Sequence, residues 1–263
     1  MHFAEDAERA RAVALAKRLA DTARAIALRY FRQPLDVERK ADASPVTVAD
    51  REIEAELRRM IRAEFPEHGI RGEEFAPEGG GGFTWVIDPI DGTKSFVSGF
   101  PLFGTLIALV QGERPVVGVI ESPATGERWL GSAGTGAWLN DAPARTSACE
   151  SIERARVYST TADTIRGAHR ERYDRYTHRA PMRRFGGDCY LYGLLASGHC
   201  DLVVEAALQP HDFMALVPVV EGAGGRISDW EGRALGWDSG DRVLAAATPA
   251  LWEQAVAALT DPG

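Results

Sequence analysis

Residues 85–93 read Trp-Val-Ile-Asp-Pro-Ile-Asp-Gly-Thr (WVIDPIDGT), an apolar run that leads into two closely spaced acids, Asp88 and Asp91. The residues that precede Asp88 are typical of a β-strand. Because Pro89 has a fixed φ and no N–H to donate, we expect the strand to end at Asp88 and the chain to turn at Pro89. Asp91 would then point back into the same pocket as Asp88.

Two carboxylates so close together repel each other, and their repulsion raises the pKa of one of them. A divalent cation removes this conflict, and Mg²⁺ prefers oxygen ligands. An isolated Asp-Pro-x-Asp-Gly run more often caps a turn, but two features favour a metal site. Gly72-Glu73-Glu74 stands at a predicted strand end, and Asp212 precedes an apolar helix. Gly92 and Thr93, at the start of a short helical turn, offer backbone N–H groups to a phosphate oxygen.

The rest of the chain shows two regions with different patterns. Two helices, over residues 5–31 and from an N-cap at Asp50 to Pro66, precede a run of strands. After residue 150 strands and helices alternate, which is typical of an α/β lobe. We therefore expect one domain over residues 1–263, with an α+β metal-loop lobe at 1–145 and an α/β substrate-contacting lobe at 150–263. The expected strands are 83–87, 105–110, 116–121, 128–130, 136–139, 157–160, 202–205, 227–229 and 243–247, and the later helices are 165–176, 189–197, 213–221 and 249–259.

Composition argues against several classes of protein. The formal net charge of −8 disfavours nucleic acid as a partner, since phosphate backbones are bound by clustered Lys and Arg. An acidic protein that handles phosphate needs cations to reverse the local field. No run approaches the ~20 apolar residues of a membrane helix, and residues 1–20 lack the apolar core of a signal peptide. Three cysteines without metal-type spacing favour reduced thiols in a cytoplasmic protein.

Four motifs together resemble one protein family. They are DPIDGT, the upstream GEE, the loop SPVTVAD and the late run HDFMALVPVVEGAGG, and they resemble the inositol-monophosphatase-like phosphatases from about residue 10 to residue 260. The resemblance implies a layered α-β-α-β-α sandwich of the inositol monophosphatase/fructose-1,6-bisphosphatase type. It also implies dependence on two or three Mg²⁺ ions and, frequently, a homodimer.

The resemblance also assigns roles to individual residues. Thr93 would position the attacking water, with Asp42 in the preceding loop as its partner, whereas Asp50 would be structural. Glu73 would take part in activating the water. His211 stands where the family usually has Trp, which bears on the substrate rather than on the metal site. The implied metal ligands are Glu73, Asp88, the carbonyl of Ile90, Asp91 and Asp212, and the implied substrate contacts are Asp91, Gly92, Thr93, Asp188, Glu205 and Asp212.

Two acids bear on the choice of substrate. Asp188 and Glu205 fall where the family contacts the substrate, and they would suit a cationic group better than the hydroxyls of inositol. The run GGDCYLYGLLASGHCDLVVEA looks most like that of the histidinol-phosphate phosphatases, whose substrate carries an ammonium group and an imidazole. Asp188 could instead cap the helix that follows it, and Glu205 could be a surface strand end.

Three other functions stay open at this point. Inositol 1-phosphate could be the substrate, or the enzyme could accept a broad range of sugar or nucleotide phosphates. The chain could also be a catalytically silent binding protein of the same fold, which predicts that a metal ligand is missing. All the candidate carboxylates are present, so an Mg²⁺-dependent phosphate-monoester hydrolase that uses activated water is the favoured hypothesis.

Overall fold

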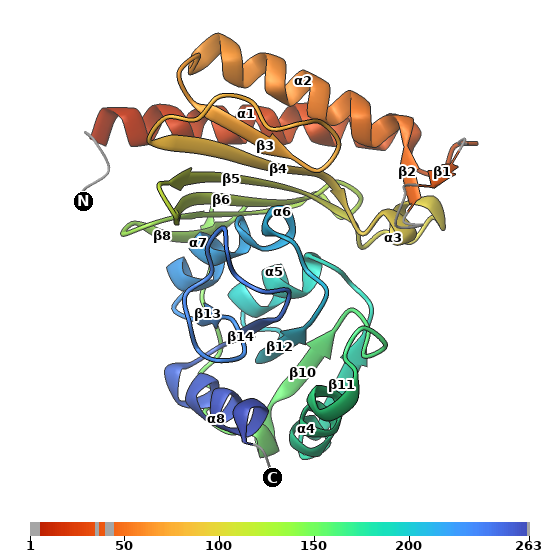
Figure 1. The fold of residues 1–263 in the computed structure, drawn as a ribbon, viewed down its shortest axis with the longest axis vertical. Coiled ribbons are helices and arrows are strands. Elements are labelled where there is room, and N and C mark those ends of the chain that lie inside the picture. Colours follow the sequence, from red (N-terminus) through yellow and green to blue (C-terminus); the bar gives the residue numbers. More distant parts are fainter. Residues whose placement is uncertain (1–5, 35–36, 40–44, 262–263) are drawn as a thin grey trace.

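The computed structural model describes residues 6–34, 37–39 and 45–261 of the chain. Its helices and sheets are stacked in five layers, α-β-α-β-α, as Figure 1 shows. Three clusters of buried apolar side chains fill the spaces between these layers. The predicted layered sandwich is therefore confirmed.

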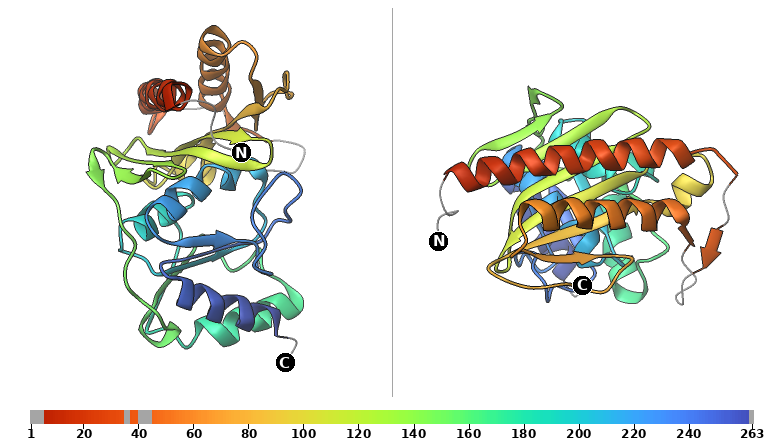
Figure 2. Two further views of the ribbon diagram at one scale, coloured as in Figure 1. Left: turned by 90° about the vertical axis from the view of Figure 1, so that its left-hand side faces the viewer. Right: turned by 90° about the horizontal axis from the view of Figure 1, so that it is seen from above.

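The first layer consists of two long helices that lie side by side on the outer face of the first sheet (Figure 2). These are α1 (Asp6–Tyr30) and α2 (Val48–Glu64). In α2 the buried residues Ile53, Leu57 and Ile61 recur at helical spacing and face the sheet.

The start of α2 differs from the prediction. Thr47, not Asp50, is the N-cap residue, and its hydroxyl accepts a hydrogen bond from the Ala49 N–H at 3.1 Å. Asp50 stands three residues further on and accepts the Thr47 N–H at 2.8 Å, which completes a capping box. The prediction that Asp50 caps the helix was wrong, because in the Thr-x-x-Asp pattern the threonine is the cap and the aspartate accepts the N–H of that threonine.

A seven-stranded sheet forms the second layer, and only its first pair of strands is parallel. Strand β4 continues through Pro89 as far as Asp91, so the predicted sharp turn after Asp88 was wrong. The ladder to β5 shifts register between Asp88 and Asp91, and this irregularity accommodates the proline. The strands in spatial order are β3 (Gly69–Gly72), β4 (Phe83–Asp91), β5 (Gly104–Gln111), β6 (Arg114–Ser122), β7 (Glu127–Ser132), β8 (Gly136–Leu139) and β9 (Ala142–Pro143).

The third layer is a group of short helices between the two sheets, visible in Figure 1. A Cβ atom at Gly118 or Gly131 would overlap the backbone around Ala215 or Pro218, so these glycines allow the close approach of helix to sheet. One predicted helix over 213–221 is two helices here. The layer contains α5 (Tyr190–Ala196), α6 (Pro210–Phe213) and α7 (Leu216–Gly222).

A five-stranded sheet and two outer helices complete the stack. Strand β11 lies at the edge of this sheet and was not predicted, because its Met-Arg-Arg-Phe sequence has the charge of a solvated loop. The strands in spatial order are β11 (Met182–Phe185), β10 (Arg156–Ser159), β12 (Leu202–Glu205), β14 (Val243–Ala246) and β13 (Arg226–Ser228), and the outer helices are α4 (Gly167–Thr177) and α8 (Pro249–Thr260). The minor elements are β1 (Val37–Arg39), β2 (Pro45–Thr47), α3 (Thr93–Val97) and a 3₁₀ turn at Ile152–Arg154.

Among the helices of the described residues, none combines the length and the apolar character that a membrane span requires. The three cysteines of the chain are free thiols in the structure.

Candidate active site

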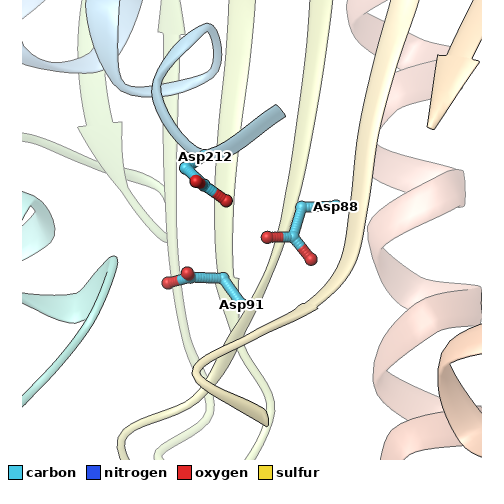
Figure 3. Close-up of side chains that lie close together, drawn as sticks. All are labelled: Asp88, Asp91 and Asp212. Carbon is cyan, nitrogen blue, oxygen red and sulfur yellow. The ribbon is translucent and has the colours of Figure 1, made fainter. Parts of the chain in front are cut away.

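Three aspartates meet where β4 ends against the middle layer of helices. Asp88 and Asp91 come from β4, and Asp212 comes from α6, more than a hundred residues later. One carboxylate oxygen of each lies within 4.8 Å of the others, and the side chains converge on a common point in Figure 3. We call these three residues the acid cluster.

The acid cluster is buried enough for its charges to conflict. Asp88 is 2% exposed, and its Oδ1 atom has no hydrogen-bond partner among the described residues. Burial first, and then the charges of Glu73, Asp91 and Asp212, raise the pKa of Asp88 well above its usual range. Burial also raises the pKa of Asp91 and that of Asp212. A bound cation would reverse these shifts and give the Asp88 oxygen a partner, so the donor set fits a divalent ion that prefers oxygen ligands.

Glu73 reaches the same place from the neighbouring strand. Strand β3 runs parallel to β4 and pairs Gly72 with Ile87, so Glu73, directly after the end of β3, follows beside Asp88 of β4. The negative charge of Glu73 raises the pKa of both Asp88 and Asp212. The structure therefore brings a fourth carboxylate to the acid cluster.

The backbone after Asp91 turns into α3 beside the acid cluster. The Thr93 hydroxyl donates a hydrogen bond to the carbonyl oxygen of Ile90 at 3.1 Å. Gly92 is the N-cap of α3 and has a left-handed φ of 78°. A Cβ atom there would lie 2.7 Å from an oxygen of Asp188, so glycine allows both the turn and the approach of that acid.

A pocket of about 170 Å³ opens beside the acid cluster. Asp91 and Asp212 form part of its wall, and Asp188, Glu205 and Lys94 are its other charged residues. A carboxylate of Asp91 also accepts the backbone N–H of Cys189 at 2.6 Å, which ties β4 to the region of α5.

Asp188 and Glu205, the two acids that bear on the choice of substrate, both line this pocket. Asp188 accepts the Ser95 hydroxyl at 2.9 Å, while α5 begins at Tyr190 without a side-chain cap, so Asp188 is not a helix cap. Glu205 ends β12, is only 5% exposed and accepts the Thr160 N–H at 2.7 Å, so it is not a surface strand end. Burial raises the pKa of Asp188 and that of Glu205.

Four further charged or titratable residues were predicted to lie near the site or lie near it in the structure. Asp42 lies outside the described residues. Asp50 is buried, and its pKa is raised by that burial and, to a smaller extent, by the charge of Glu73, so it is a further acid close to the site. His211 Nε2 lies 3.4 Å from an oxygen of Asp212. The signal that could have found Lys94 is its position directly after DPIDGT, which places it on α3 at the pocket.

Comparison with known proteins finds relatives along almost the whole chain. The sequence profile of the inositol monophosphatase family matches residues 8–261. The "Bifunctional phosphatase IMPL2, chloroplastic" of Arabidopsis thaliana is 41% identical over 91% of this chain and 70% of its own length. A histidinol-phosphatase of Chlorobaculum parvum is 40% identical over 83% of this chain and 86% of its own length.

A solved structure is similar to this chain both in fold and in amino-acid sequence. The structure of an inositol monophosphatase from Zymomonas mobilis matches with a TM-score of 0.87 and 43% identity, over 95% of this chain and 97% of that one. The predicted type of layered sandwich is thereby confirmed. The chain is a phosphatase that belongs to the inositol monophosphatase family.

Proposed function

We propose that this phosphatase hydrolyses histidinol phosphate to histidinol and phosphate in an Mg²⁺-dependent reaction. The observation that carries the proposal is a pair of carboxylates in the pocket beside the acid cluster, of which Glu205 is buried and Asp188 is partly buried. Histidinol phosphate carries an ammonium group and an imidazole, and carboxylates bind such groups through charge-assisted hydrogen bonds. The relative named histidinol-phosphatase supports the same substrate.

The proposed metal ligands are the acid cluster, Glu73 and the carbonyl oxygen of Ile90, for two or three Mg²⁺ ions. The unpartnered Oδ1 atom of Asp88 and the raised pKa values of the acid cluster support this assignment. Bound Mg²⁺ would neutralise the carboxylates and the phosphate and would lower the pKa of the attacking water.

The residues of the chain would orient the reactants for in-line attack. The Thr93 hydroxyl donates its hydrogen to Ile90, so its oxygen can accept a hydrogen bond from the attacking water. Gly92 and Thr93 would present backbone N–H groups to a phosphate oxygen. Asp42 as the partner of Thr93 stays a prediction. No protein nucleophile is required, and burial raises the pKa of the nearest thiol, Cys189, well above its usual range.

The test is phosphate release from histidinol phosphate and from inositol 1-phosphate, each with Mg²⁺ and with EDTA. Asp188→Ala should raise KM for histidinol phosphate by roughly tenfold or more, because a charge-assisted hydrogen bond contributes about 1.5–3 kcal/mol, and it should change KM for inositol 1-phosphate far less. Ser95→Ala is the matched control, since it removes the partner of Asp188 and keeps its charge. Equal effects of Asp188→Ala on the two substrates would overturn the assignment, as would full activity in EDTA.

A second candidate is hydrolysis of inositol 1-phosphate or of a broader range of phosphate esters. The likeness to the inositol monophosphatase of Zymomonas mobilis favours it. It predicts a higher kcat/KM for inositol 1-phosphate than for histidinol phosphate in the same experiment. A homodimer is proposed from the family resemblance alone, and sedimentation analysis tests it. A cytoplasmic location is proposed from the spacing of the cysteines.

A further inference from the structure

The segment that carries Glu73 is a loop closed at its base by backbone hydrogen bonds. Ile70 and Glu78 exchange two N–H···O bonds, each 2.8 Å long. Helix α2 lies over this edge of the sheet and packs against β4 (Figure 2). Two side chains of α2, Glu54 and Arg58, reach into the loop.

Glu54 binds the backbone directly after Glu73. Its carboxylate accepts the N–H of Glu74 at 2.7 Å and the N–H of Phe75 at 3.2 Å. The Glu54 side chain is completely buried, and a buried carboxylate is tolerated only where charged and polar partners surround it. The position of Glu54 therefore fixes the chain on the C-terminal side of Glu73.

Arg58 supplies the charge that this buried carboxylate needs. Its Nε donates to Glu54 at 2.8 Å, and its side chain is only 2% exposed. The same guanidinium donates to the Phe75 carbonyl at 3.0 Å and to the Glu78 carboxylate at 2.9 Å. One planar group thus joins the helix to two points of the loop.

Gly72 shows that the Glu54 carboxylate also lies against the chain just before Glu73. A Cβ atom at Gly72 would overlap the Glu54 carboxylate, so any larger residue would displace it. The pair Glu54–Arg58 consequently contacts the backbone on both sides of Glu73.

We propose that Glu54 and Arg58 are positioning residues that hold Glu73 towards the acid cluster. The inference rests on the proposed function, because it takes Glu73 to be a metal ligand. Groups that orient a ligand without touching the metal raise affinity, because the ligand is already in place when the ion binds. The pair performs this task through the backbone of residues 72–75.

The experiment measures Mg²⁺ binding by calorimetry, with Mg²⁺ alone, and kcat, with Tm in EDTA as the check on folding. Glu54→Gln keeps the side-chain shape but replaces one acceptor oxygen by a donor. It should weaken Mg²⁺ binding roughly 10- to 100-fold and lower kcat, with a smaller change in KM. Glu56→Gln is the matched control, since Glu56 forms a similar pair with Arg59 on the exposed face of the same helix.

Two further variants cover the case in which Glu54→Gln does not fold. Arg58→Lys keeps the charge but loses the planar fork, and Gly72→Ala displaces the carboxylate without removing a charge. Each should also weaken Mg²⁺ binding at least tenfold, on the same order as loss of a ligand-orienting group. A Kd for Mg²⁺ within about twofold of the wild type in the folded variants would overturn the inference.

Glu73→Gln separates this inference from the proposed function. Unchanged Mg²⁺ binding in Glu73→Gln would show that Glu73 is not a ligand, and the proposed metal site would then be wrong. Weakened binding in Glu73→Gln together with normal binding in Glu54→Gln would leave the metal site intact and refute only the positioning role.

Discussion

Replacing Asp88 by asparagine should abolish Mg²⁺ binding and activity and yet stabilise the metal-free fold. The carboxylates of the acid cluster lie within 4.8 Å of one another, where one repulsive pair is worth about 3.5 kcal/mol at an effective dielectric constant of ~20. The repulsion in the metal-free cluster cannot exceed the cost of protonating one of its carboxylates. For a carboxylate with the ordinary pKa of 3.8, protonation at a pH of about 7.5 costs about 5 kcal/mol.

The gain in stability is smaller than the repulsion, because the asparagine amide is as buried as the Asp88 carboxylate and one of its polar atoms takes the place of the unpartnered Oδ1. An unsatisfied buried polar group of this kind costs about 2 kcal/mol. Subtracting this cost from the repulsion of about 3.5–5 kcal/mol leaves a net gain in stability of about 1.5–3 kcal/mol. In a chain of this size one kcal/mol shifts Tm by roughly 2–4 °C, so Tm in EDTA should rise by roughly 3–12 °C.

The assay is thermal unfolding of wild type and Asp88→Asn in EDTA and in Mg²⁺, together with phosphate release. Asp141→Asn is the matched control, because Asp141 is exposed and lines a different pocket, next to Val13 and Lys17 of α1. A lower Tm in EDTA, combined with a wild-type response to Mg²⁺, would refute the reasoning from repulsion and from metal binding together.

Two other predictions concern pH and Gly92. The raised pKa values of the acid cluster stabilise the metal-free fold below the ordinary pKa of about 3.8, and this contribution is lost as the pH rises through the folded-state values. At a fixed Mg²⁺ concentration, a hundredfold above Kd at pH 8, Mg²⁺ should raise Tm by about 5–10 °C at pH 8 and by less at pH 5, and an equal increase at both pH values in thermal scans would contradict the prediction. Gly92→Ala should lower kcat/KM at least tenfold, since its Cβ would lie 2.7 Å from Asp188 at a φ of 78°. Gly99→Ala at a φ of 75° has similar backbone strain but only an ordinary contact with Arg32, so an equal loss of kcat/KM there would show that strain alone is responsible.

Several features near the site could not be predicted fully from the sequence. Asp188 stands directly before a helix, and only the fold reveals that it binds Ser95, 93 residues earlier in the chain. Strand β11 has too few apolar residues to be predicted, and it forms because β10 offers it a parallel partner. The extent of β4 was underestimated because a bulge accommodates Pro89.

The sequence by itself determined the periodicity of most helices and strands, the family, and the identity of the acids that could bind a metal. These features are local, since apolar spacing and the DPIDGT motif depend on residues close together in the chain. Only the tertiary structure decided that Asp212 meets Asp88 and Asp91, that Glu205 is buried in the adjoining pocket, and that Glu54 binds the loop of Glu73. Those contacts depend on how two sheets and the helices between them pack, and packing joins residues that no local pattern relates.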